Sequence, residues 1–395
     1  MKIAIIAFFS KYKRGIPRVT EELISKLSEA DNVESVSIIA AKTEKDYVSP
    51  SLLRDDKVSL FVVRSFLLPW TFFRAVKLLK KSDALLVFHP CYAFWFWLWY
   101  RLCDFQLLMR FGILPKAKWV QMLHDVVLDA CPEDFGVSKG NTLYKSIWIN
   151  WINYFAQLPA RYVAISESTK KEAMRYWGLP ADKITVVHHG SFITPKNPRV
   201  NFGSKKILMV SDISPRKNQL RLIEAFELVH QNNLCSGAEL MIVGLFRRDI
   251  PGFESTLRDI RRRNRGIKIT LTGYVPDSEI LSLYEEADIF VYPSLYEGFG
   301  LPVLEAMACG CPVIGSNVTS LPEVVGEAGM LVDPYDVEAL ARAMSAVLQD
   351  DELKREMSRK GIEQAQKFSW EKASAELLAV CSEVAERASQ QKGSR

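Results

Sequence analysis

The sequence predicts an α/β protein built from two doubly wound domains, each with a parallel sheet. Short apolar runs alternate with segments of helical period along most of the chain, which is the pattern of parallel strands wrapped by helices. At 395 residues the chain is long enough for two such domains. Residues 192–204 interrupt the alternation with prolines and polar residues before a fresh apolar run begins at Lys206, so we expect the domains to be joined there.

The strands of both halves are predicted from the apolar runs themselves. A parallel strand is covered on both faces, so it reads as a nearly continuous apolar run. We expect a first domain over residues 1–200, a second over 201–370 and a helix over 371–395. The predicted strands are 2–8, 35–40, 58–63, 84–88, 118–123, 161–165, 184–188, 206–210, 239–243, 268–272, 289–292 and 312–315.

The composition excludes several classes of protein. With 48% hydrophobic and 25% charged residues and no long polar tract, the chain is not disordered as a whole. A net charge of +5 does not by itself indicate nucleic acid, although it suits an anionic ligand. The seven cysteines form no CxxC pair and their number is odd, which favours a reducing compartment over a disulfide framework.

Apolar segments in the first half raise the question of a membrane. The N-terminal run lacks a small-residue cleavage site, so we expect a buried strand and a cytoplasmic protein. The most apolar stretch, Tyr92 to Tyr100, is far shorter than the roughly 20 residues of a spanning helix. In residues 67–81 apolar side chains fall near one helical face, with basic residues alongside. Both stretches fit either the inner face of a membrane or a domain core or subunit contact.

The strongest functional signal lies between Val291 and Met307. A buried strand ends at Pro293, and Gly298 and Gly300 then permit tight turns before Pro302 occupies the first turn of a helix. Exposed N–H groups and the positive end of the helix dipole favour a phosphate at such a position. Because parallel strands end at one edge of a sheet, this loop is expected at a ligand site.

Two glutamates flank this loop. Glu305 falls in the first helical turn, where its carboxylate could accept hydrogen bonds from a vicinal diol such as ribose, and Glu297 at the loop entrance could hold a second polyol, the sugar. The alternative is that Glu297 caps the turn and Glu305 only favours the helix dipole.

The stretch from Ser294 to Glu305, continued through Ser316 and Leu321-Pro322-Glu323, resembles the glutamate-x7-glutamate signature of the retaining glycosyltransferases of family 4. Ser214 to Gln219 is similar to the family's donor-phosphate loop, and Thr272 to Val275 to the strand end that carries the nucleotide base. The resemblance implies a GT-B fold, in which two Rossmann-like domains face a central cleft and the C-terminal helix crosses back to the N-terminal domain.

The N-terminal half is similar to the same family at three places. Residues 14–18 resemble its glycine loop, 124–125 its cleft-facing histidine motif and 166–168 a following strand-end motif. The resemblance implies that His124 contacts the donor sugar, although a lone histidine is often structural. Asp125 would orient it or bind the acceptor, and Gly15 would lie at the donor phosphate or the acceptor unless it only makes a strand-to-helix turn.

The family assigns roles to the remaining positions. Arg216 and Lys217 would neutralise the departing diphosphate, unless they are merely solvated. Many members carry an arginine where this chain has Ser211-Asp212, so which cation contributes most is open. The catalytic set is therefore expected to be His124, Glu297, Arg216 and Lys217, and the donor-binding set Gly15, Gly273, Tyr274, Gly298, Phe299, Gly300, Leu301 and Glu305.

The chemistry implied is a transfer with retention and without a metal. No DxD motif is evident in a plausible nucleotide loop, so we expect no cofactor beyond the nucleotide-sugar co-substrate. The family presents no clear carboxylate nucleophile of the kind that retaining glycosidases use. We expect a front-face route in which the donor's own phosphate oxygen takes the acceptor proton.

The predicted function is transfer of a hexose, with mannose favoured, from a UDP- or GDP-sugar to a glycan or lipid-linked acceptor in polysaccharide, lipopolysaccharide or glycolipid biosynthesis. A nicotinamide-dependent oxidoreductase is disfavoured because Phe8 to Lys11 replace the GxGxxG fingerprint. A sugar-nucleotide epimerase of similar fold and a catalytically silent partner subunit remain as alternatives. The basic run 261–265 lacks interleaved aromatics, so no nucleic acid partner is expected.

Overall fold

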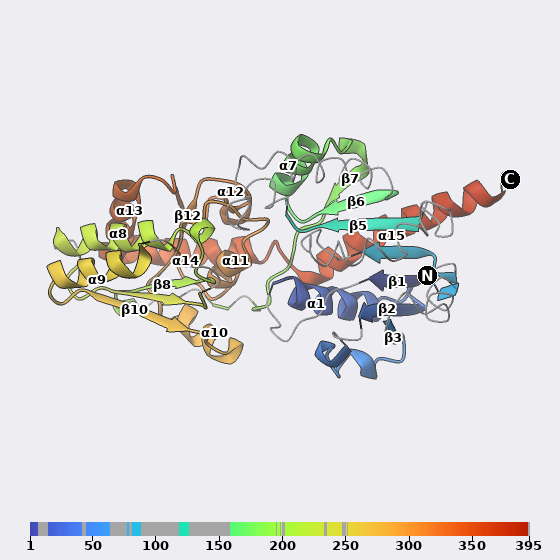
Figure 1. The fold of residues 1–395 in the computed structure, drawn as a ribbon, viewed down its shortest axis with the longest axis horizontal. Helices are drawn as coiled ribbons and strands as arrows, with labels where there is room; N and C mark the ends of the chain where they lie inside the picture. Colours follow the sequence, from blue (N-terminus) through green and yellow to red (C-terminus); the bar gives the residue numbers. More distant parts are fainter. Residues whose placement is uncertain are drawn as a thin grey trace. The chain divides into compact units, whose positions relative to one another are not determined.

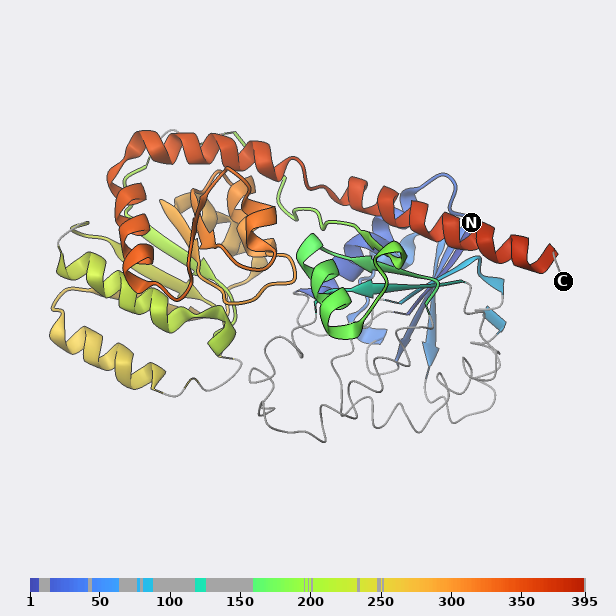
Figure 2. The same cartoon turned by 90° about the horizontal axis from the view of Figure 1, so that it is seen from above.

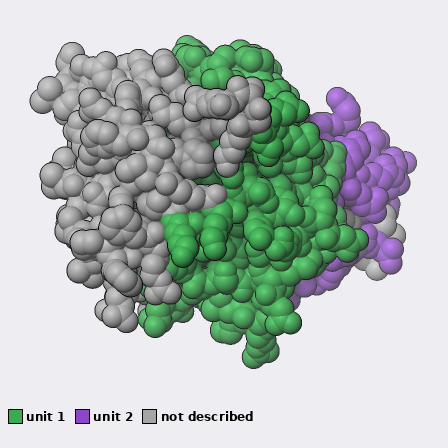
Figure 3. All heavy atoms as spheres, turned by 90° about the vertical axis from the view of Figure 1, so that its right-hand side faces the viewer, with its two compact units in different colours: residues 1–126, 140–190, 370–395 green, residues 127–139, 191–369 purple. Residues whose placement is uncertain are grey.

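The protein is represented by a computed structural model that describes residues 1–6, 15–41, 45–63, 77–78, 81–87, 118–125, 159–194, 196–197, 199, 202–232, 235–246, 250 and 252–393 (Figure 1). Two compact units are distinguished within these residues (Figure 3). The first contains the described residues of Met1–Val126, Gly140–Gly190 and Trp370–Arg395, and the second those of Ser191–Ser369.

The first unit is a seven-stranded sheet in the order β3-β2-β1-β4-β5-β6-β7, with every pair of neighbours parallel. The order reverses between β1 and β4, which makes this the topological switch point of a doubly wound sheet. The strands are β1 Lys2–Ile6, β2 Ser35–Ala41, β3 Val58–Val63, β4 Ala84–Val87, β5 Trp119–Leu123, β6 Arg161–Ala164 and β7 Ile184–Val186.

Local sequence signals account for the helices of this unit. Helix α1 (Ile16–Glu29) starts after Gly15, which has a φ of 61°, and places Pro17 in its first turn, where the missing N–H costs nothing. Helix α7 (Glu167–Trp177) is capped by Ser166, whose Oγ accepts the N–H of Thr169 at 3.0 Å. Single-turn helices lie at Lys45–Tyr47, Leu52–Arg54 and Ala181–Lys183.

The C-terminal helix α15 (Trp370–Gly393) belongs to the first unit. It packs on α1 and on β4, β5 and β6, and Figures 1 and 2 show it running along that sheet. Arg161 of β6 donates to Glu383 at 2.6 Å, and Lys26 of α1 lies 3.2 Å from Glu371. Leu377 and Cys381 are fully buried, so an apolar stripe as well as ion pairs holds the helix in place.

The second unit is a six-stranded parallel sheet in the order β10-β9-β8-β11-β12-β13, which reverses between β8 and β11. Its strands are β8 Lys206–Val210, β9 Glu239–Val243, β10 Lys268–Gly273, β11 Ile289–Tyr292, β12 Val313–Ser316 and β13 Met330–Val332. Its helices are α8 Gln219–Gln231, α9 Phe253–Arg263, α10 Asp277–Glu286, α11 Leu301–Ala308, α12 Leu321–Val325, α13 Val337–Gln349 and α14 Asp351–Ala365, with a single turn at Pro215–Lys217.

A buried carboxylate anchors the start of the second unit. Asp288, which is fully buried just before β11, accepts the backbone N–H groups of Gly203 and Lys205 at 3.0 and 2.9 Å. Lys354 of α14 is also buried and lies 3.8 Å from the same carboxylate. These hydrogen bonds tie the segment before β8 to the residue before β11. The two strands are therefore held side by side at the switch point.

The prediction of two doubly wound domains is confirmed by these sheets. Each predicted strand from 35–40 onward overlaps an observed strand, and the helical spacing after Asp336 is resolved into α13, α14 and α15. No helix in the described parts of the chain is long and apolar enough to span a membrane. The predictions for 67–81 and 92–100 lie outside the described residues, apart from positions 77, 78 and 81.

Candidate active site

The loop after β8 carries two cations and is locked to the loop after β11. Asn218 adopts a left-handed conformation with a φ of 63° between the turn Pro215–Lys217 and α8. Its side-chain Nδ2 donates to the carbonyls of Pro293 and Pro334 at 2.9 and 2.7 Å. An asparagine tolerates this backbone better than most residues and here also bridges three segments. The loop is therefore held at the switch point between β8 and β11.

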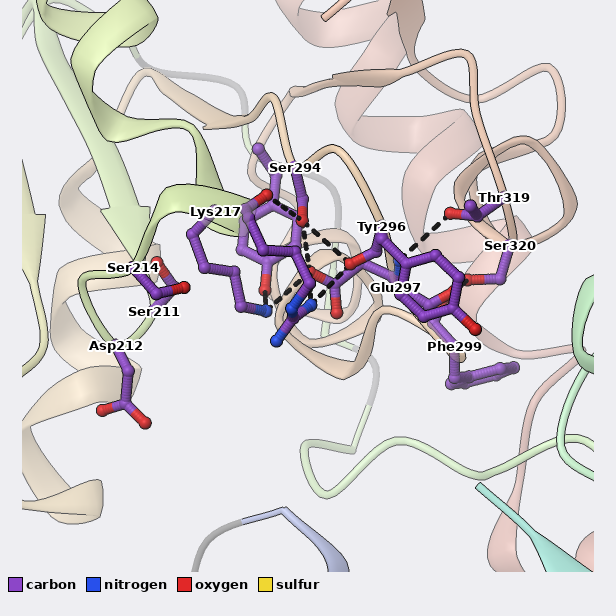
Figure 4. A network of polar contacts seen from close by, with 12 residues as sticks. Ser211, Asp212, Ser214, Lys217, Ser294, Tyr296, Glu297, Phe299, Thr319 and Ser320 are labelled. Carbon is purple, nitrogen blue, oxygen red and sulfur yellow. Dashed lines mark hydrogen bonds and ion pairs between the residues drawn. The ribbon is translucent and has the colours of Figure 1, made fainter. Parts of the chain in front are cut away.

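A charged cluster occupies this point (Figure 4). The Lys217 Nζ donates to Glu297 Oε1 at 2.6 Å and to the Tyr292 hydroxyl at 2.6 Å. The Arg216 guanidinium donates to the same Oε1 at 3.3 Å and to the carbonyl of Tyr296 at 2.5 Å. The Ser294 hydroxyl adds a third donor to Oε1 at 2.6 Å. Two neighbouring strand ends thus bring both predicted cations onto one predicted carboxylate.

The two carboxylate oxygens of Glu297 differ in their hydrogen bonds. Among the described residues, every side-chain hydrogen bond to this carboxylate ends on Oε1. The backbone of Glu297 is fixed as well, because its N–H donates to Thr319 Oγ1 at 3.1 Å and its carbonyl accepts from Ser320 Oγ at 3.0 Å. The carboxylate is consequently held rigid through one oxygen.

Burial and charge act in opposite directions on this cluster. Burial by itself would raise the pKa of Glu297, but the positive charges of Lys217 and Arg216 outweigh it and hold that pKa below its ordinary value. Burial lowers the pKa of Lys217 despite the attraction of Glu297. Two cations facing one carboxylate leave a local excess of positive charge, which suits an anionic ligand.

The loop leading into α11 consists of two glycines on either side of a buried phenylalanine. Gly300 has a φ of 113°, a conformation for which glycine is needed, and a Cβ there would lie 2.7 Å from Leu321 Cδ2. The Phe299 ring is buried edge-on against Phe368, with 5.8 Å between ring centroids. Gly298 precedes it, and Leu301 opens the helix. The predicted donor residues 298–301 therefore form a turn whose N–H groups precede a helix N-terminus.

Glu305 lies in a different network from Glu297. It follows one turn into α11, is partly exposed, and accepts a hydrogen bond from the Tyr284 hydroxyl at 3.2 Å. Tyr284 is fully buried in α10, and burial first and the charge of Glu305 second raise its pKa well above the ordinary value. The phenol therefore stays protonated and keeps donating to Glu305.

The predicted base-binding residues close β10. Gly273 has a φ of 71° and accepts the N–H of Gly244 at 2.9 Å, and Tyr274 follows with 51% of its surface exposed. Both lie two strands from β8 on the side away from β11.

The three predicted residues of the first unit lie at the carboxyl ends of its strands or at a helix start. Gly15 is exposed and accepts the Val19 N–H at 3.1 Å at the start of α1. His124 follows β5, is buried, and packs against His189 with 5.8 Å between ring centroids. Burial lowers the pKa of His124 to about 4, so its imidazole is neutral near pH 7. Asp125 comes next and is partly exposed.

Comparison with known proteins decides the family. Residues 13–191 match the model of Glycosyltransferase Family 4, and residues 192–364 match that of Glycosyl transferases group 1. The O-antigen chain mannosyltransferase B of Escherichia coli is 31% identical over 397 residues, covering 96% of this chain and 98% of that protein. The chain belongs to glycosyltransferase family 4.

Further similarities agree with this assignment. The serotype-specific mannosyltransferase WbdA of Escherichia coli is 31% identical over 272 residues, which cover 64% of this chain and 32% of WbdA. The crystal structure of Anabaena HepE in complex with UDP and glucose matches this glycosyltransferase over 100% of both chains, with a TM-score of 0.63 and 18% identity. That of WaaG, a glycosyltransferase involved in lipopolysaccharide biosynthesis, matches over 96% of this chain and 99% of that one, with a TM-score of 0.64 and 16% identity. The fold is thus the GT-B fold.

Sequence reasoning left several residues of this glycosyltransferase site without a role. Tyr292 and Ser294 bind the charged pair directly, Asn218 joins the two loops, and Thr319 and Ser320 hold the Glu297 backbone. The one available signal was Tyr292, because a tyrosine that ends a buried strand needs a partner for its hydroxyl. Within the described residues no group of three or more His, Cys, Asp and Glu side chains is arranged to hold a metal ion.

Proposed function

We propose that this glycosyltransferase is a retaining, metal-independent mannosyltransferase that uses a UDP- or GDP-sugar and extends a glycan or lipid-linked acceptor in polysaccharide or lipopolysaccharide biosynthesis. The observation that carries the proposal is the convergence of Arg216 and Lys217 on Glu297 at the switch point, beside the N-terminus of α11.

The two cations suit the diphosphate of the donor. When the glycosidic bond to the diphosphate breaks, negative charge grows on the departing oxygen, and fixed cations stabilise it without reorganisation. Lys217 and Arg216 are already positioned by Tyr292, Glu297 and the Tyr296 carbonyl. The N-terminus of α11, which begins after Gly300, would add the positive end of a helix dipole to this site. Metal independence is proposed because these groups supply positive charge without an ion.

Glu297 suits the sugar. Because its bonds to Lys217, Arg216 and Ser294 all use Oε1, Oε2 remains for a hydroxyl group of the hexose. The carboxylate stays ionised because the neighbouring cations lower its pKa, and hydrogen bonds to a charged acceptor are stronger than neutral ones. Glu297 therefore serves as a positioning group for the sugar rather than as a nucleophile.

The reaction is proposed to proceed on one face of the sugar. The bond between the anomeric carbon and the diphosphate oxygen breaks, and a bond from the acceptor oxygen to that carbon forms on the same face. The acceptor proton passes to the departing phosphate oxygen, so the products are the glycoside and the protonated nucleoside diphosphate. No general base from the chain is required. The contact of His124 with the donor sugar and that of Asp125 with the acceptor stay predictions.

Mannose and the acceptor class are taken from the relatives. A mannosyltransferase of O-antigen chains matches 96% of this chain at 31% identity. A structural neighbour of the same fold bears UDP and glucose, which supports a nucleotide-sugar donor. The cytoplasmic location and the peripheral membrane contact expected from the sequence are retained as proposals.

The test is a transfer assay with purified protein. GDP-mannose, UDP-glucose and other common donors are each incubated with an aryl mannoside acceptor, with and without EDTA. We expect nucleoside diphosphate release that depends on acceptor, survives EDTA and gives an α-linked product from an α-linked donor by NMR. Product of inverted configuration would refute retention, and loss of rate in EDTA would refute metal independence. Conversion of the donor in the absence of acceptor would favour the epimerase. The absence of turnover with every donor would favour the silent partner subunit.

A charge variant tests the phosphate assignment. Lys217→Met removes the buried cation while keeping its apolar stem, and we expect the affinity for the nucleoside diphosphate to fall at least tenfold. Lys268→Met serves as the matched control, because Lys268 is an exposed lysine of the same unit that pairs only with Glu239 in the described contacts. Unchanged affinity in Lys217→Met would mean that the phosphates bind elsewhere.

A further inference from the structure

Three buried aromatic rings form a row that joins α10 to β11. The Tyr284 ring of α10 meets Phe290 of β11 edge-on, with 5.4 Å between ring centroids, and Phe290 stacks on Tyr292 with 5.7 Å between centroids. Phe290 and Tyr292 are two residues apart in one strand, so their side chains lie on the same face of the sheet. All three side chains are fully buried. Because close packing leaves such rings little freedom, the row fixes the positions of the two phenol hydroxyls.

The two hydroxyl groups of this row reach the two glutamates of the site, one through a lysine and one directly. The Tyr292 hydroxyl accepts a hydrogen bond from Lys217 Nζ, which also donates to Glu297, and both distances are 2.6 Å. The Tyr284 hydroxyl donates to Glu305 Oε2 at 3.2 Å. One buried aromatic row therefore supports both carboxylates that the sequence predicted to hold polyols.

Glu305 lies on the accessible face of α11. This helix has eight residues, and the five at 303, 304 and 306–308 are buried. Leu301, Pro302 and Glu305 are partly exposed, and they lie within the first turn and a half of the helix. The Glu305 side chain is therefore accessible to a ligand at the same helix end that is proposed to face the diphosphate, while a buried phenol holds it from the protein side.

The phenol acts as a donor to this carboxylate. Burial, and after it the charge of Glu305, raise the pKa of Tyr284 well above its ordinary value, so the hydroxyl keeps its proton near neutral pH. An ionised carboxylate offers about four acceptor sites. One bond from Tyr284 fixes the direction of the carboxylate without exhausting these sites. The two hydroxyls of a vicinal diol are a matching pair of donors.

We propose that Tyr284 is a positioning residue for the ribose of the donor, on which it acts through Glu305. The phenol sets the direction in which the Glu305 carboxylate meets the 2′ and 3′ hydroxyls of the nucleotide. The sequence pointed to Glu305 alone, so Tyr284 is an addition made by the structure. The inference rests on the proposed function, because it takes a nucleoside diphosphate at Arg216 and Lys217 as its starting point.

The test combines removal of a hydroxyl from the protein with removal of hydroxyls from the ligand. Tyr284→Phe removes only the phenol oxygen and keeps the aromatic row. GDP, UDP, their 2′,3′-dideoxy analogues and inorganic pyrophosphate are titrated calorimetrically into wild type and variant. One hydrogen bond contributes a factor of about 2 to 10 in affinity, and we expect Tyr284→Phe to weaken the preferred nucleoside diphosphate by that factor. The dideoxy analogue and pyrophosphate should bind both proteins equally, because neither presents a diol to Glu305.

Two further variants separate positioning from a general effect on the fold. Tyr335→Phe is the matched control, since Tyr335 is 61% exposed and contacts Arg221 through its ring, and its affinities should equal those of wild type. In Glu305→Ala the positioned carboxylate is gone. Adding Tyr284→Phe to Glu305→Ala should therefore change no affinity further, whereas a structural effect of Tyr284 would persist in that background.

Equal affinities of wild type and Tyr284→Phe for every ligand would overturn the inference and leave the proposed function standing. A loss as large for the dideoxy analogue as for the parent nucleotide would also overturn it, because the effect would then be structural. A wild-type protein that binds the two nucleotides equally would show that Glu305 holds no diol, and this too would leave the phosphate site in place. A wild-type protein that binds no nucleotide at all would refute the proposed function together with the inference.

Discussion

Replacing Glu297 by glutamine separates the two roles assigned to the charged cluster. Three donors, from Lys217, Arg216 and Ser294, converge on Oε1 and require an oxygen there. In Glu297→Gln the amide oxygen should take that place, which puts the amide NH₂ where Oε2 was. The group that faces the sugar then changes from a charged acceptor to a neutral donor.

The magnitudes follow from this exchange. Loss of a hydrogen bond to a charged group costs about 1.5–3 kcal/mol, so transfer should slow roughly 10- to 150-fold. Removing one partner of a buried ion pair lowers the free energy of unfolding by about 3–5 kcal/mol. Because the amide keeps the three hydrogen bonds, we expect a smaller loss of about 2 kcal/mol. For a unit of this length that loss corresponds to ~4–8 °C in Tm. Nucleoside diphosphate affinity should hold or rise, because both cations are no longer opposed by a carboxylate.

The assay is a set of initial rates at varied donor concentration together with calorimetric titration of GDP and UDP. Glu254→Gln is the matched control, because Glu254 is an exposed glutamate in the first turn of α9 in the same unit. A nucleotide affinity that falls in proportion to the rate would refute the separation of roles. An unchanged rate would remove Glu297 from the sugar site.

Two predictions concern stability. A Cβ at Gly244, whose φ is 150°, would lie 1.9 Å from the Ser211 carbonyl oxygen. At the control position Gly237, φ is 82° and nothing lies within 4 Å of a Cβ. Gly244→Ala should therefore lower the free energy of unfolding by at least about 2 kcal/mol more than Gly237→Ala, and equal urea midpoints of the two variants would contradict this. Burial lowers the pKa of His124 from 6.5 to about 4, so the unfolded state binds a proton first as the pH falls, and the free energy of unfolding should drop between pH 6.5 and 4 by up to roughly 3 kcal/mol. His124→Asn should flatten that decline in urea titrations at several pH values, and an identical slope in the variant would mean that His124 is exposed to water.

Some of the candidate site could be read from the chain alone. The turn from Gly298 to Leu301 was predicted because glycines, a proline and a following apolar helical pattern determine local backbone directly. Glu297 was singled out by its place at the entrance of this loop, and Arg216 and Lys217 by resemblance. The meeting of the three residues depends on parallel strands ending at one edge of the sheet. The turn was thus predicted from a short-range pattern, and the meeting of the charged residues from a general rule of parallel sheets.

Other features had no sequence signal. That Glu305 binds Tyr284, and that Asn218 reaches Pro293 and Pro334, depends on side chains brought together across 21 to 116 residues.

The sequence by itself determined the alternation of buried strands and amphipathic helices, and with it two doubly wound domains, because apolar periodicity reports which faces must be covered. It also determined the chemical groups available at each strand end. Only the tertiary structure decided that both cations bind a single oxygen of Glu297. Contacts of this kind are set by packing between elements that are distant along the chain, where no local propensity acts.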